Sequence, residues 1–94
     1  MKHNLRTIKK LIIRLGNISD VEDMVIDDGG SIDMVADAMH SLRVTAPKEL
    51  RQNDTGIIQY HRWNTMYKEA LVVNDNKLAA AAQKEIDKLV KDVY

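Results

Sequence analysis

The sequence has no cysteine and no phenylalanine, and it has one proline among 94 residues. Without cysteine, the chain can form neither a disulfide framework nor a thiolate zinc site. One tryptophan and three tyrosines are its only aromatic residues, so the core must be built mainly from aliphatic side chains and methionine. Because reducing compartments hold proteins without disulfides, we expect a cytoplasmic location.

Long apolar stretches are also missing. No run approaches the roughly 20 apolar residues that a transmembrane helix needs, and no secretory leader pattern is found at the start. We therefore expect no transmembrane segment. The length predicts one helical domain over residues 1–94, with charged N-terminal helices in 1–52 and a C-terminal helical hairpin in 53–94.

Most of the chain repeats its apolar residues with the 3.6-residue period of an α-helix. The pattern predicts an all-α fold, a small bundle of four main helices plus one short helix, ending in an antiparallel helical hairpin. Gly16 is placed to end the first helix. The helix N-caps are predicted at Asn4, at Ser19, at Ser31 and at one of the residues 53–55.

The hairpin has the most regular pattern, with a polar turn at residues 74–76. One side of its first helix carries Tyr60, Trp63, Met66, Tyr67, Ala70 and Leu71. The facing side of its second helix carries Leu78, Ala79, Ala82, Ile86, Leu89, Val90 and Val93. Large side chains over small ones let two helices approach closely, so we expect Trp63 to be buried against the alanines.

Charge is balanced overall but separated along the chain. The net charge is zero, yet residues 1–19 contain bases and no acid, whereas residues 20–38 contain acids and no base. The first helix is therefore basic and amphipathic, and it can bind an acidic surface or pair with the acidic helix that follows. Candidate partner-binding residues are those of this basic face, together with two on the outer side of the hairpin: Lys2, Arg6, Lys9, Lys10, Ile13, Arg14, His61 and Arg62.

Catalytic and metal-binding patterns are weak. Asp33, Asp37 and His40 share one side of the third predicted helix, but no fourth ligand accompanies them. The acidic, glycine-containing segment 27–33 does not have the ligand spacing of an EF-hand loop. Neither a nucleophile elbow nor a phosphate-binding loop is present. We therefore predict no metal, no cofactor and no enzymatic activity.

Two functional classes remain open. The first is a small non-catalytic protein-interaction protein (an adaptor, inhibitor or assembly factor) that binds another protein or a second copy of itself. Within this class, the acidic segment 20–37 can imitate DNA. The alternative is a nucleic-acid-binding module that uses the basic first helix with Arg43, Lys48, Arg51 and Arg62. The zero net charge argues against it, because phosphate backbones require a positive surface.

Overall fold

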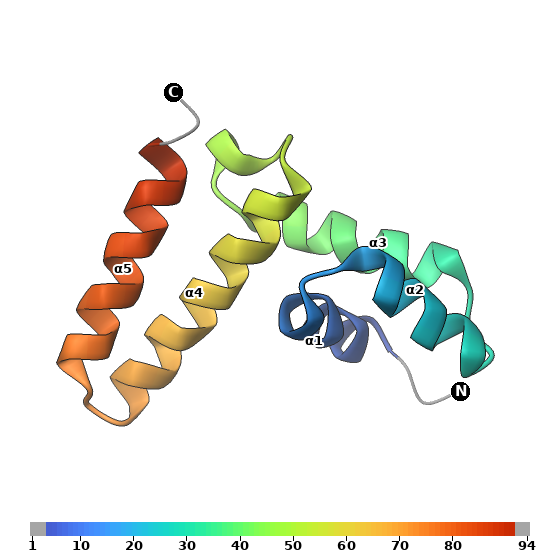
Figure 1. Ribbon diagram of the computed structural model, residues 1–94, viewed down its shortest axis with the longest axis horizontal. Coiled ribbons are helices and arrows are strands. Elements are labelled where there is room, and N and C mark those ends of the chain that lie inside the picture. Colours follow the sequence, from blue (N-terminus) through green and yellow to red (C-terminus); the bar gives the residue numbers. More distant parts are fainter. Residues whose placement is uncertain (1–3, 92–94) are drawn as a thin grey trace. The chain divides into compact units, whose positions relative to one another are not determined.

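The computed structural model describes residues 4–91 (Figure 1). Within this range the chain forms five α-helices and one 3₁₀ turn, and no strand. The predicted all-α fold is confirmed, including the short second helix and the terminal hairpin. The elements are α1 (Leu5–Leu15), α2 (Ile18–Asp27), α3 (Ile32–Val44), η1 (Lys48–Leu50), α4 (Asp54–Val72) and α5 (Asn76–Lys91).

Contacts group the chain into two compact units, residues 1–45 and 46–94. The first unit contains α1, α2 and α3, and the second contains η1, α4 and α5. The prediction of one domain over residues 1–94 stays a prediction. None of the described helices combines the length and the apolar character needed to cross a bilayer.

The first unit is a three-helix arrangement in which each helix contacts the other two. Its core is aliphatic, as the absence of phenylalanine requires. Ile8 and Ile12 of α1, Val21 and Val25 of α2 are completely buried, and Val35 of α3 is 1% exposed. The apolar side of the basic first helix is therefore used for packing inside the unit.

The start of α2 differs from the prediction. Ser19 was predicted as its N-cap, but α2 begins at Ile18, and the Oδ1 atom of Asn17 accepts a hydrogen bond from the Ser19 backbone amide at 2.9 Å. Asn caps a helix about as well as Ser. Because Gly16 takes the left-handed conformation (φ 71°) and ends α1 as predicted, the chain turns at once and the adjacent Asn17 becomes the cap.

The second unit is an antiparallel hairpin with the short turn η1 packed against both of its helices. Asn53 caps α4, because its Oδ1 accepts from the Gly56 amide at 3.1 Å. At the far end Asn74 has a φ of 59°, and Asp75 Oδ1 accepts from the Leu78 amide at 3.1 Å. These two residues turn the chain and start α5.

Small residues line the contact between α4 and α5, as predicted. Ala70 and Ala82 are completely buried, and Ala79 is 6% exposed. The expected burial of Trp63 is wrong, however, since its side chain is only half-buried. Trp63 lines an open groove between α4 and α5, so part of its large indole ring stays exposed.

Candidate functional site

The predicted basic face lies along one side of α1. Arg6, Lys10 and Arg14 are exposed, whereas Lys9 and Ile13 are half-buried. Lys9 reaches α3, where its Nζ donates a hydrogen bond to Ser41 Oγ at 3.4 Å. The face is thus partly anchored to the first unit. Lys2, the remaining member of the predicted set, lies outside the described residues.

The acidic segment does not neutralise the centre of this basic face. Within residues 4–91, Arg6, Lys9 and Lys10 form no ion pair with the carboxylates of α2 and α3. Most of the carboxylates in the acidic segment are themselves exposed, namely those of Asp20, Asp23, Asp27, Asp28, Asp33 and Asp37. The first unit therefore presents acidic side chains to solvent as well as the exposed Arg6 and Lys10.

His61 and Arg62 do not form one site. His61 is half-buried, and its ring packs edge-on against Tyr60 with a centroid distance of 5.0 Å and an interplanar angle of 75°. Arg62 is exposed and borders a groove on the hairpin. Neighbouring residues of a helix point about 100° apart, so the two side chains leave α4 in different directions.

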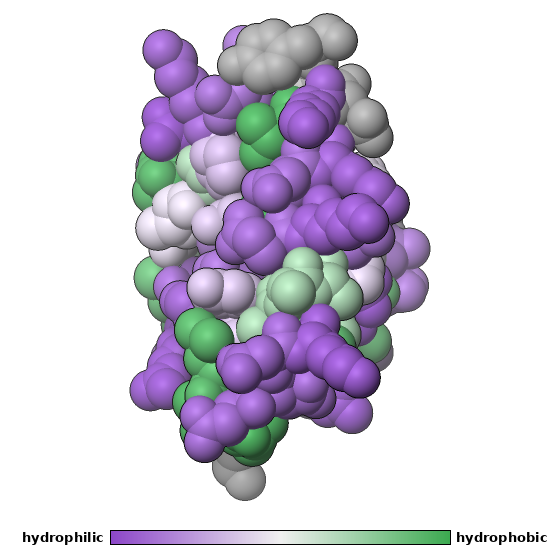
Figure 2. All heavy atoms as spheres, turned by 90° about the vertical axis from the view of Figure 1, so that its left-hand side faces the viewer, coloured by the Kyte–Doolittle hydropathy of each residue, from purple (hydrophilic) through white to green (hydrophobic). Residues whose placement is uncertain are grey.

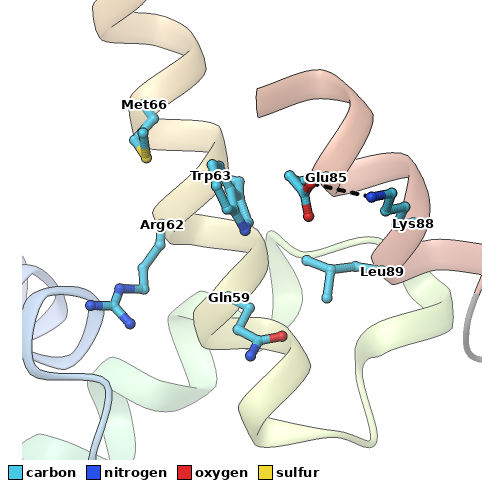
Figure 3. A pocket seen from close by; sticks show the side chains of 7 residues that line it. All are labelled: Gln59, Arg62, Trp63, Met66, Glu85, Lys88 and Leu89. Atoms are coloured by element: carbon cyan, nitrogen blue, oxygen red, sulfur yellow. Dashed lines mark hydrogen bonds and ion pairs between the residues drawn. The ribbon is translucent and has the colours of Figure 1, made fainter. Parts of the chain in front are cut away.

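That groove lies between α4 and α5 in the second unit. It has a volume of about 520 Å³, and its lining residues are Gln59, Arg62, Trp63, Met66, Glu85, Lys88 and Leu89. Figure 3 shows the Trp63 indole on the α5 side of α4, with Glu85 and Leu89 reaching toward it. The guanidinium of Arg62 points away from α5 in the same view.

The groove combines apolar and charged groups. Trp63 and Leu89 are half-buried, and Met66 is 36% exposed. At its edge, Lys88 Nζ lies 3.4 Å from Glu85 Oε1, one turn away on α5. The indole and the apolar side chains of Met66 and Leu89 can bind an apolar surface, while the charges at the edge select its orientation.

Apolar residues are also exposed at the end of the hairpin that carries the turn. Val72 is 82% exposed and Val73 is 70% exposed, with Leu71 and Leu78 nearby at 48% and 37%. Figure 2 looks onto the side of the hairpin formed by α5. That side is largely hydrophilic, and hydrophobic residues gather toward its lower end.

The first unit has a smaller groove between α2 and α3, with a volume of about 240 Å³. Its lining is mainly aliphatic, with one acid and one base: Ile18, Glu22, Ile32, Val35, Ala36, Met39 and Arg43. It holds no cluster of titratable groups that would suggest chemistry. We interpret it as the shallow groove that two packed helices leave between them, not as a ligand site.

No metal centre is assembled by the described residues. Asp33, Asp37 and His40 are all exposed on α3, and no group of three His, Cys, Asp or Glu side chains within residues 4–91 is placed to hold an ion. The basic residues of the nucleic-acid alternative are divided between the units. Arg43 belongs to the first, whereas Lys48, Arg51 and Arg62 belong to the second.

Comparisons with protein-family models, curated proteins and solved structures give no match. The functional argument therefore rests on the surfaces described above. Of the residues predicted as partner-binding, Arg62 alone borders the hairpin groove. Trp63, Met66, Glu85 and Leu89 were not predicted, because the helical pattern assigned the apolar ones among them to the core.

Proposed function

We propose that this chain is a small non-catalytic protein-interaction protein, acting as an adaptor, inhibitor or assembly factor. The observation that carries the proposal is the hairpin groove, in which the half-buried Trp63 and the apolar side chains of Met66 and Leu89 remain open to solvent. Tryptophan, methionine and arginine are enriched in protein interfaces, and tryptophan most often supplies their central energetic contacts. A cytoplasmic location belongs to the same proposal, supported by the absence of cysteine.

The groove fits a protein surface better than a small substrate. It is an open trough between two helices, and the ion pair between Lys88 and Glu85 lies at its edge. No nucleophile and base face each other across it, as acid–base or covalent catalysis would require. Its residues can provide an apolar centre and a charged border, which is the usual arrangement of an interaction site.

A capture experiment tests the proposal. The tagged full-length chain is incubated with lysate of its own host, and the bound proteins are compared with those bound by Met66→Asp and Lys84→Glu variants. Met66 lines the groove, while Lys84 is exposed on α5 and is not part of the groove lining. We expect a bound protein that is lost with Met66→Asp and kept with Lys84→Glu.

Two readouts complete that experiment. A differently tagged copy of the chain is included, so that self-association is detected as well as binding of another protein. Circular dichroism confirms that both variants keep the helical content of the parent. Capture that is identical for the two variants would contradict the assignment of the groove as the interaction surface.

Nucleic-acid binding is the second candidate, favoured by the exposed Arg6, Lys10 and Arg14 on one side of α1. The test is the mobility of random-sequence duplex and single-stranded DNA at low salt, where nonspecific phosphate contacts are strongest. Under the protein-interaction proposal we expect no shift. A shift that Arg6→Glu/Lys10→Glu abolishes would favour the nucleic-acid function instead.

A further inference from the structure

The two helices that border the groove share one residue spacing. On α4, Gln59, Trp63, Met66 and Ala70 follow one another at intervals of 4, 3 and 4 residues. On α5, Leu78, Ala82, Glu85 and Leu89 do the same. Alternating intervals of 3 and 4 are the spacing of helices that pack side by side in coiled coils and bundles. We call these eight residues the hairpin face.

The hairpin face is only partly covered within its own unit. Ala70 and Ala82 are completely buried between α4 and α5, but Trp63 and Leu89 are half-buried, and Met66 and Leu78 are 36% and 37% exposed. A two-helix hairpin has no second layer of helices to cover these partly exposed side chains. Knob-into-hole packing is completed when further helices cover the face, and the antiparallel four-helix bundle is the simplest closed arrangement.

Glu85 is the one charged residue of the hairpin face, and its charge favours one kind of partner. Apart from Gln59, the other residues of the hairpin face are apolar or small, and a polar residue at such a position usually sets register and orientation. Lys88 follows one turn later, with its Nζ 3.4 Å from Glu85 Oε1. A twofold axis that lies between the two copies, perpendicular to the helices and level with these two residues, sets each copy's Glu85 opposite Lys88 of the other copy.

The same axis places the apolar centre of one copy's hairpin face against that of the other copy. Figure 3 shows Trp63 at about the same height along the hairpin as Glu85, so an axis beside Glu85 passes close to Trp63. The two indole rings would then meet at the centre of the contact, where interface tryptophans contribute most. Another protein would need to supply both the opposing apolar layer and this charge order, whereas a second copy supplies both by symmetry.

We propose that the hairpin face binds the hairpin face of a second copy, forming an antiparallel four-helix bundle around Trp63. This inference rests on the proposed function, because it takes the groove as the interaction surface and names its occupant. The charge pattern makes the pairing testable by complementation. Lys88→Glu makes both positions acidic, and Glu85→Lys makes both positions basic.

The experiment measures the mass of the full-length chain by sedimentation equilibrium from low micromolar to millimolar concentration. We expect the parent chain to dimerise, and each single variant to need at least about tenfold higher concentration, because like charges then face each other across the axis. An equimolar mixture of Lys88→Glu and Glu85→Lys is expected to recover a heterodimer. Met66→Asp, which does not touch the ion pair, should weaken the dimer as well.

Lys84→Glu is the matched control, since it makes the same charge change as Lys88→Glu at an exposed position of α5 outside the hairpin face. It should dimerise like the parent. A parent chain that stays monomeric at millimolar concentration would overturn the pairing, as would a dimer that Lys88→Glu and Lys84→Glu weaken equally. Groove-dependent capture of a different protein would still support the proposed function in that case, so the two failures are distinguishable.

Discussion

The size of the Trp63 side chain leaves part of this residue at the surface rather than in the core. The helical pattern places it on the apolar side of α4, and the structure keeps it there but leaves it half-buried. In the same helix, Ile57 is completely buried. An indole is too large for a two-helix contact lined by alanines to enclose, so part of its ring remains available for binding.

This difference predicts unequal costs of truncation. Ile57→Ala should lower the free energy of unfolding by roughly 2–5 kcal/mol, whereas Trp63→Ala should cost about 1–2 kcal/mol, below the roughly 3–5 kcal/mol typical of a fully buried aromatic. Urea unfolding at low protein concentration, where self-association does not contribute, measures both values. If Trp63→Ala costs as much as Ile57→Ala or more, Trp63 acts as a core residue.

The N-cap residues of this chain differ in whether their side chains make a capping hydrogen bond. Asn53 accepts a hydrogen bond from the Gly56 amide at 3.1 Å at the start of α4. Ser31 occupies the corresponding position before α3, but its side chain makes no capping hydrogen bond. The same sequence signal, a small polar residue before an apolar helix, therefore has different energetic weight in the two places.

We expect Asn53→Ala to lower the free energy of unfolding by about 1 kcal/mol, because it leaves the Gly56 amide without its side-chain acceptor. Ser31→Ala should cost no more than a few tenths, since no capping bond is lost. Thermal melts of the two variants under identical conditions give the comparison. Equal losses would mean that Ser31 caps α3 in solution.

The packing of the basic helix α1 changes how its apolar side is interpreted. Its basic amphipathic pattern alone also suits a helix that lies in a membrane surface. In the structure Ile8 and Ile12 are completely buried in the first unit, so the apolar side is not available for insertion into lipid. What α1 can offer a partner is its charged side, with exposed Arg6, Lys10 and Arg14.

At the scale of the whole molecule, the chain divides into two compact units at residues 45 and 46. The prediction of one domain implies that both units lose structure together. Calorimetry of the full-length chain should then give one transition whose calorimetric and van't Hoff enthalpies agree. Two resolved transitions, with Ile12→Ala shifting one and Ile86→Ala the other, would contradict a single domain.

Self-association adds a second expectation at this scale. A dimer that forms only from folded chains raises the midpoint of thermal unfolding as the protein concentration rises. We expect this dependence for the parent chain and for Lys84→Glu, and a weaker one for Lys88→Glu. A midpoint that is independent of concentration in all three would argue against the four-helix pairing.

Much of the fold was predictable from the sequence because helix formation depends on local signals. The period of the apolar residues, Gly16, Asn4 and the polar turn at 74–76 located the helices and the hairpin, and the structure confirms them. The choice between Asn17 and Ser19 as a cap was not predictable from the pattern, because both residues can cap and the neighbouring left-handed Gly16 decides between them.

The candidate site was less predictable for a physical reason. A sequence pattern tells which side of a helix is apolar, but it does not tell how much of that side a neighbour covers. The all-α class, the hairpin and the separated charges followed from the 94 residues alone. Only the tertiary structure showed that Trp63, Met66 and Leu89 remain open beside Glu85 and Lys88, because burial depends on the number and spacing of the helices packed around them.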